Sequence, residues 1–258
     1  MTLFDKFLRI RELGIFSIIV VFVVVAAIID PRFMTLDSWR AVFLAIPLIL
    51  VMAMGQMMVI ICRHVDISIG SILAFSAIVI GLLYIQFPGL SLWLSLLITA
   101  FVGLIMGLIN GFIVTRFNVH SIIVTLGTLS LYRGLVFIVS GGRQIDRNDI
   151  PEHVVSFSQT SFLFSIPAIL IFSAIIVIIT HLVMRHSVLG REIYATGSNP
   201  EAAHLKGINV TKVTLFCFGV CGMLAGVAGL FYASRFGYVN PGVTGVGIEF
   251  IVIAGVII

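Results

Sequence analysis

Charged residues are scarce in this chain of 258 residues, making up 10% of it against about 25% in a soluble domain. Lysine occurs three times and never after a glycine, so the Gly-Lys-Ser/Thr ending of a phosphate-binding P-loop is missing. The Gly-x-Ser-x-Gly elbow of hydrolases and the His-Glu signature of metalloproteases are missing as well. These absences predict that the chain is no enzyme and hydrolyses no ATP by the P-loop route.

Cysteine is also scarce, and Cys62, Cys217 and Cys221 all lie in apolar runs. Cys217 and Cys221 are one helical turn apart and can share a face. No histidine or carboxylate lies near this pair in the sequence to complete a metal site. Packing is therefore the expected role of the thiols, and no metal or other cofactor is predicted in the chain.

Basic residues outnumber acidic ones, which gives a net charge of +4 and an isoelectric point near 9.2. No basic patch is interleaved with aromatic side chains, so nucleic acid is excluded as a partner. The excess is instead typical of membrane proteins, whose cytoplasmic loops collect lysine and arginine.

Long apolar runs are abundant, since 60% of the residues are hydrophobic. Runs near the ~20 residues that cross a bilayer predict an all-α membrane protein, with residues 1–258 forming one transmembrane domain. The first run follows basic residues as in a signal peptide, but its length and the lack of a clean cleavage pattern favour an uncleaved span. The predicted spans are Leu13–Ile29, Ala41–Cys62 with a kink at Pro47, Ile67–Phe87, Leu92–Thr115, Ser121–Val139, Phe162–Met184 and Val213–Ser234.

An eighth apolar run begins at Ile248 and reaches Ile258, the last residue of the sequence. Eleven residues form about 16 Å of helix, against ~30 Å of hydrocarbon. Helix carbonyls left in lipid cost several kcal/mol each. We therefore expect this span, and with it the chain, to be cut short.

The distribution of basic residues predicts the orientation of the spans. Nine of the lysines and arginines lie in the segments predicted inside, which are 1–12, 63–66, 115–120 and 185–212. Five lie in the segments predicted outside, which are 30–40, 86–91, 140–160 and 235–247. Because positive residues favour the cytoplasmic side, the N-terminus and the 185–212 loop are expected there.

The 185–212 loop is predicted to contain a short helix. Asn199 suits the N-cap, Pro200 suits the first helical position, and Gly207 suits the stop. The helix from Pro200 to Lys206 is about 10 Å long, too short to cross a bilayer. A capped helix on a basic loop between spans is expected to dock on a partner in the cytoplasm.

Two charged side chains occur at or within the predicted spans. Asp66 precedes the third span, where it either caps the helix N-terminus or marks a substrate or ion path. Arg133 lies six residues from the outer end of the fifth span, a Gly-, Thr- and Ser-rich segment expected to be broken or only partly inserted. Its side chain either snorkels outward or contacts solute or a buried partner.

Neutral polar groups also occur in the spans, namely Asn110, Thr125, Thr128 and Ser130. They suit a polyhydroxylated solute, although packing hydrogen bonds explain them equally well. Small residues recur at helical spacing as well, as Gly103, Gly107 and Gly111 in the fourth span and as Gly222, Gly226 and Gly229 in the seventh. Such rows let helices approach closely, and we expect intrachain packing, with a sliding pore-lining or dimer-facing helix as the alternative.

Several motifs follow one another along most of the chain: Asp66-Ile67-Ser68-Ile69-Gly70-Ser71, Thr125-Leu126-Gly127-Thr128-Leu129, Tyr132-Arg133-Gly134, Ser140-Gly141-Gly142, Ala195-Thr196-Gly197-Ser198-Asn199-Pro200-Glu201-Ala202-Ala203 with Gly207, Ala233-Ser234-Arg235, and Gly245-x-Gly247-x-Glu249. In these motifs the sequence resembles the permease subunits of bacterial ABC sugar importers of the ribose, xylose and arabinose type, including the autoinducer-2 permeases. Members of that family continue well beyond the position of Ile258.

The resemblance implies a multi-span importer permease of the inner membrane that pairs with a second permease subunit and is surrounded by lipid. A separate ABC ATPase subunit would hold ATP and Mg, and a periplasmic solute-binding protein would deliver the solute. The 185–212 loop would carry a coupling helix that inserts into a cleft of the ATPase. The expected coupling residues are Ser198, Asn199, Glu201, Ala202, Ala203 and Gly207.

The expected function is therefore import of a monosaccharide or sugar-derived signal, with the ribose, rhamnose, xylose and autoinducer-2 classes all open and a slight preference for autoinducer-2 or rhamnose. Candidates for the translocation path are Asp66, Ser68, Asn110, Thr125, Thr128 and Arg133. The alternative is a secondary transporter or channel driven by an ion gradient. Such a protein needs ionisable residues deep in the spans, and these are scarce apart from Arg133.

Overall fold

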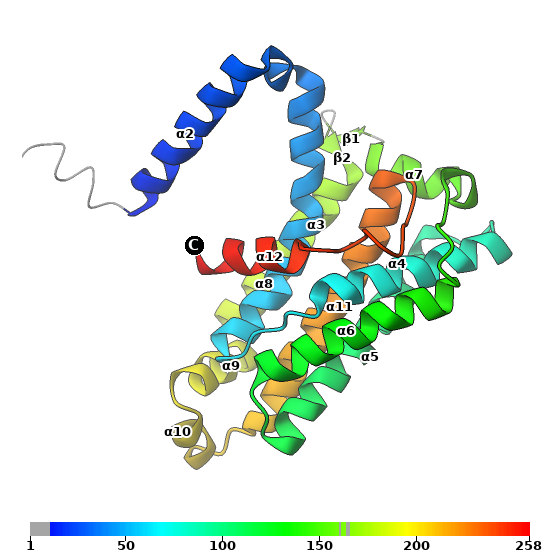
Figure 1. The fold of residues 1–258 in the computed structure, drawn as a ribbon. Helices are drawn as coiled ribbons and strands as arrows, with labels where there is room; N and C mark the ends of the chain where they lie inside the picture. The colour runs from blue at the N-terminus through cyan, green and yellow to red at the C-terminus, as the bar shows by residue number, and fades with distance from the viewer. Residues whose placement is uncertain (1–10, 160, 164–165) are drawn as a thin grey trace, which may run out of the picture. The chain divides into compact units, whose positions relative to one another are not determined.

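The computed structural model describes residues 11–159, 161–163 and 166–258. They fall into two compact units, one ending at Ala45 and the other spanning Ile46–Ile258. Helices make up most of both units (Figure 1). The exception is a short antiparallel pair of strands, β1 (Ser161–Leu163) and β2 (Ile166–Pro167). The predicted all-α, multi-span membrane fold is confirmed.

The smaller unit holds the helix predicted as the first span. It contains α2 (Arg11–Ile29), the 3-10 turn η1 (Pro31–Met34) and the first turns of α3 (Leu36–Ile61). Asp30 caps η1 by accepting from the Arg32 backbone N–H at 2.9 Å, and its carboxylate pairs with the Arg32 guanidinium at 3.0 Å. The hydrophobic side chains of α2 are largely exposed, as expected of a helix that meets lipid or another subunit.

The larger unit contains the rest of α3 and the remaining helices. In chain order these are α4 (Ile69–Gln86), α5 (Leu92–Phe117), α6 (Ser121–Ser140), the 3-10 turn η2 (Arg147–Asp149), α7 (Glu152–Gln159), α8 (Ala168–His186), α9 (Val188–Ser198), α10 (Pro200–Leu205), α11 (Val210–Phe236) and α12 (Ile248–Ile257). Among the described residues six helices are long and apolar enough to cross a membrane, and they are α3, α4, α5, α6, α8 and α11. Phe16–Ile29 of α2 and all of α12 are shorter apolar helices.

Two expectations about these elements were wrong. The sixth span begins at Ala168 and not at Phe162, because the β1–β2 pair occupies the residues before it. The fifth span is an unbroken helix of 20 residues, α6. Its hydroxyl groups bond to carbonyls of the preceding turn, as when Thr125 Oγ1 donates to the Ser121 oxygen at 2.9 Å, and so do not interrupt it. The helices α7 and α9 were not predicted at all.

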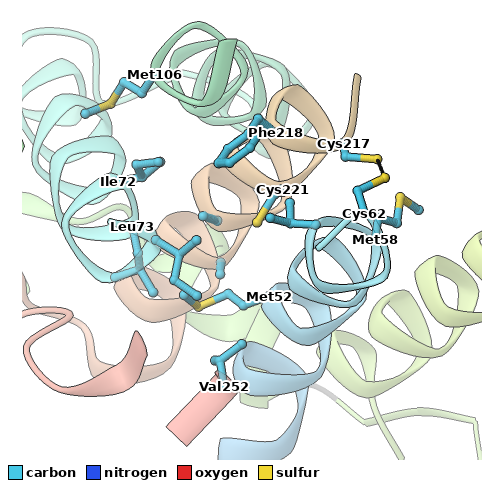
Figure 2. Packing of buried hydrophobic residues seen from close by; sticks show 14 of the residues in the cluster. Met52, Met58, Cys62, Ile72, Leu73, Met106, Cys217, Phe218, Cys221 and Val252 are labelled. Carbon is cyan, nitrogen blue, oxygen red and sulfur yellow. Dashed lines mark hydrogen bonds between the residues drawn. The ribbon is translucent and has the colours of Figure 1, made fainter. Parts of the chain in front are cut away.

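The core of the larger unit is built around α11, the most buried of the six spans. Figure 2 shows Cys217, Phe218 and Cys221 of α11 among side chains from α3, α4 and α5. Cys62 Sγ and Cys217 Sγ lie 3.5 Å apart and both thiols are free. The cysteines therefore pack in the core.

Glycines bring α5 and α11 into backbone contact. A Cβ atom added at Gly103 would overlap the Gly222 carbonyl oxygen, and one at Gly107 would overlap that of Phe218. From the other side, a Cβ at Gly222 would lie 2.7 Å from the Gly107 Cα. Most of the predicted small residues thus pack α5 on α11, and Gly229 packs on α4 instead, so both rows pack within the chain as expected.

We predict that Gly222→Ala destabilises the protein by about 1–3 kcal/mol, because the added methyl group must push α5 away from α11. Thermal unfolding of the purified protein in detergent measures the effect. Gly127→Ala on α6 is the matched control, since a Cβ there meets nothing within 4 Å. It should be neutral or stabilising by up to about 1 kcal/mol, because alanine is the better helix former. Equal shifts for both variants would contradict the packing argument.

Candidate functional site

The loop between α8 and α11 folds into two helices, α9 and α10, which are separated by Asn199 alone. Ser187 caps α9 by accepting from the Gly190 N–H at 2.9 Å, and Asn199 Oδ1 caps α10 by accepting from the Ala202 N–H at 3.1 Å. Pro200 occupies the first position of α10. Gly207, with φ of +85°, ends it, and the Ile208 N–H returns to the Ala203 carbonyl at 3.1 Å. The predicted short helix and both of its caps are confirmed.

The helix α10 presents most of its surface to the outside of the unit. Ala203 is its buried residue and anchors it, whereas Glu201, Ala202 and Lys206 are exposed. Leu205 is an apolar side chain that is 86% exposed. The exposed face of α10, with the side chains of Glu201, Leu205 and Lys206, is therefore open to contact another surface.

The end of α9 rests on the end of α3. A Cβ at Gly197 would overlap the Ile61 carbonyl oxygen, so the two backbones are in direct contact there. The Arg63 guanidinium donates to the Ser198 carbonyl oxygen at 2.5 Å. Of the predicted coupling residues, Ser198 therefore lies at this contact, while Asn199, Glu201, Ala202, Ala203 and Gly207 belong to α10 and its caps.

A buried polar cluster lies directly after this contact, between α3 and α4. Asp66 Oδ1 accepts from the Ser68 N–H at 2.8 Å and from Ser68 Oγ at 2.7 Å. Asn110 Nδ2 of α5 donates to Ser68 Oγ at 2.8 Å and to Asp66 Oδ2 at 3.3 Å. Tyr132 of α6 donates to Asn110 Oδ1 at 3.2 Å. The structure thus brings together three predicted path residues, Asp66, Ser68 and Asn110, all fully buried.

Asp66 does not cap α4, contrary to one of the two expectations for it. The N-cap position belongs to Ser68, and Asp66 instead closes a local turn through the Ser68 N–H. The reason is that Asp66 lies three residues before Ile69, too far to reach the first free amides of the helix, whereas its own turn lies within reach.

Sequence reasoning missed two members of the cluster, Tyr132 and Gln56. With its amide oriented to satisfy both partners, Gln56 of α3 donates to the Asp66 carbonyl at 3.3 Å and accepts from the Asp66 N–H at 3.2 Å. A glutamine amid an apolar span is the sequence signal that could have identified Gln56. Tyr132 appeared in a motif, but nothing in the sequence marked its hydroxyl as a partner of Asn110.

The other path candidates lie elsewhere on α6. Thr125 Oγ1 donates to its own helix and lies 3.4 Å from the Val65 carbonyl oxygen, next to the cluster. Thr128 is buried and donates to the Thr125 carbonyl at 3.4 Å, and the exposed Ser130 bonds within the helix. Arg133 is half-buried and donates to the Thr244 carbonyl at 2.6 Å. This carbonyl belongs to the buried Thr244 in segment 235–247, which was predicted outside, so the contact fits both an outward-directed side chain and a buried partner.

A cleft of about 390 Å³ opens beside the loop that holds the cluster. Its polar lining residues come from the ends of α3, α5, α6 and α11, and they are Arg63, His64, Thr115, Asn118, His120, Ser121, Thr211 and Thr214. Burial, and to a lesser extent the nearby His120, lower the pKa of His64, whose ring lies 5.8 Å from that of Phe218. None of the six path candidates lines this cleft in the part of the chain that the structure describes.

Residues 40–258 match a family model described as "Branched-chain amino acid transport system / permease component". The autoinducer 2 import system permease protein LsrC of Yersinia enterocolitica is 34% identical over 231 residues, which cover 90% of this chain and 62% of that protein. The LsrC proteins of Yersinia pseudotuberculosis (strain IP 31758) and Yersinia pestis (strain Pestoides F) are 32% identical over 90% of this chain and 64% of theirs. No solved structure matches the chain.

The chain therefore spans less than two thirds of the length of these curated relatives. The match nevertheless runs from the first turns of α3 through α12, and so includes every membrane-length helix, the capped α10 and the buried cluster. This chain belongs to the branched-chain amino acid transport system / permease component family, whose members are transport proteins of the membrane and not enzymes.

Proposed function

We propose that this chain is the membrane-spanning permease subunit of an ATP-binding cassette importer. The observation that carries the proposal is α10, a helix capped at both ends that joins two spans and keeps Glu201, Leu205 and Lys206 on an open face. Such a helix is suited to insertion into a cleft on a separate ATPase subunit. ATP and Mg would belong to that subunit, since this chain has no P-loop.

The proposed solute is a monosaccharide or a sugar-derived signal of the autoinducer-2 class, carried into the cytoplasm. Support comes from the relatives named as autoinducer 2 import permeases and from the neutral hydroxyl and amide groups near the break between α3 and α4. A periplasmic solute-binding protein would deliver the solute and a second permease subunit would complete the path. Closure of the ATPases would move α10, and the spans would then alternate access to the path.

The first prediction from the proposed function concerns orientation, because α10 must lie in the cytoplasm together with the N-terminus. Lys206→Cys should react with a membrane-impermeant maleimide only after the inner membrane is permeabilised, whereas Asn148→Cys, on the exposed η2, should react in intact spheroplasts. The three native cysteines are buried and give a low background. Reaction of Lys206→Cys in intact spheroplasts would refute the coupling role of α10.

The second prediction concerns the ATPase subunit. Glu201→Lys should abolish its co-purification and reduce solute uptake by about 100-fold, while insertion of the chain into the membrane survives, because a reversed charge opposes a complementary surface. Glu152→Lys is the matched control: it makes the same change in the first turn of α7, where Glu152 forms only an exposed ion pair with Arg147. The ATPase should remain bound to that variant. If Glu201→Lys retains the ATPase and normal uptake, α10 is not the coupling helix.

The third prediction concerns the buried cluster. Asn110→Leu removes the donor shared by Asp66 and Ser68 and should destabilise the protein by about 1–3 kcal/mol, the cost of leaving buried acceptors unmet. Uptake per folded molecule should fall as well, since the wall of the path near the α3–α4 break would be distorted. Ser130→Ala on the exposed face of α6 should leave both the melting temperature and uptake unchanged. Normal uptake by Asn110→Leu would remove the cluster from the path.

A further inference from the structure

Arg63 occupies a backbone position that ordinarily belongs to glycine. The helix α3 ends at Ile61, and the His64 N–H returns to the Val59 carbonyl at 3.0 Å, which is the hydrogen bond of a Schellman helix stop. This stop needs a left-handed residue, and Arg63 supplies it with φ of +64°. A side chain other than glycine costs about 1–2 kcal/mol in this conformation, so stability alone would favour glycine here.

The side chain of Arg63 has a specific partner across the sequence. Its guanidinium donates to the carbonyl of Ser198, the last residue of α9, at 2.5 Å. One residue earlier, Gly197 lets the α9 backbone touch the Ile61 carbonyl oxygen, the last residue of α3. The Cys62 thiol also lies 3.9 Å from the Ile193 carbonyl, in the buried middle of α9. Three consecutive residues at the end of α3, Ile61, Cys62 and Arg63, therefore each contact α9.

Further along the chain, Asp66 of the buried cluster lies three residues after Arg63. Ser121 Oγ at the start of α6 accepts from the Val65 N–H at 3.1 Å, so a displacement of Val65 would be transmitted to that helix. Asp66 and Ser68 bond to Asn110 of α5, and Asn110 bonds to Tyr132 of α6. A displacement at Ser198 thus has a continuous route of direct contacts to α5 and α6, which begins at Arg63.

We propose that Arg63 is the positioning residue that links the α9–α10 pair to the buried cluster, and that it keeps its unfavourable backbone conformation in order to make this link. The proposal rests on the coupling role proposed for α10 and states where the movement of α10 enters the spans. That movement enters where Arg63 contacts Ser198 and where Gly197 contacts Ile61. Strained backbone at this contact is consistent with a functional constraint, because such strain persists only where surrounding contacts hold it and is found most often at functional sites.

The test compares variants of the whole complex, purified from membranes through a tag on this chain. Arg63→Gly relieves the backbone conformation while removing the guanidinium, so its melting temperature should be unchanged or higher. The ATPase should stay bound and hydrolyse ATP within about twofold of the unmodified rate, but uptake into proteoliposomes should fall about tenfold or more. Arg63→Lys keeps one donor for the Ser198 carbonyl at the end of a flexible chain and should recover part of the uptake.

Asn118→Gly is the matched control. Among the described residues other than glycine, Asn118 is the second one, after Arg63, with a left-handed backbone. Its φ is 52°, and it lies at the turn between α5 and α6. Its replacement relieves the same conformation and removes no contact with α9, so uptake should be unchanged. Gly197→Ala should reduce uptake as Arg63→Gly does, since its methyl group forces α9 away from Ile61.

Two results would overturn the proposal. Uptake by Arg63→Gly within about twofold of the unmodified complex would show that the link carries no movement, and loss of the ATPase from Arg63→Gly would make Arg63 part of the docking surface. Failure of the proposed function looks different, because the unmodified complex would then contain no ATPase and show no ATP-dependent uptake.

Discussion

The break between α3 and α4 is the constraint on which the larger unit depends. Residues 62–68 leave helical geometry, and Asp66 and Ser68 among them are fully buried, where an unmet polar group costs about 1–3 kcal/mol. The missing partners come from side chains of three helices: Gln56 of α3 serves both backbone groups of Asp66, Asn110 of α5 holds its carboxylate, and Ser121 of α6 serves the Val65 N–H. These polar residues are therefore required in otherwise apolar spans for the fold itself, before any contact with solute.

The glycine contacts limit how this unit can move. Gly103 and Gly107 of α5 touch the backbone of α11 so closely that each carbonyl fits where a side chain would be. Sliding of one helix along the other would bring larger neighbours such as Phe218 into these places and would separate the pair. The tight packing therefore favours movement of α5 and α11 together as a rigid pair, and it argues against the sliding helix that the small residues alone allowed.

The sequence allowed accurate prediction of elements whose signal is local. The spans α4, α5, α6 and α11 were placed within a few residues because their apolar runs are uninterrupted, and α10 because Asn199, Pro200 and Gly207 are strong end signals. The helices α7 and α9 were missed because they are short and polar on one side, which resembles a loop. The pairing of Asp66 with Asn110, and of Arg133 with a backbone carbonyl, joins residues far apart in the chain and has no local signal.

Among the described residues other than glycine, Arg63 and Asn118 have a left-handed backbone, and they hold it for different reasons. Asn118 follows the general rule, since asparagine tolerates this conformation and commonly ends helices in it. Arg63 departs from that rule at the end of α3, and its long side chain reaches Ser198, 135 residues further along the chain. Arg63 is unfavourable for its own turn but well placed for Ser198. The contact with α9 therefore accounts for an arginine at this position. The loop that carries α9 and α10 therefore contacts the end of α3 at Ile61, Cys62 and Arg63, and at Arg63 the requirement of the turn conflicts with that of the contact.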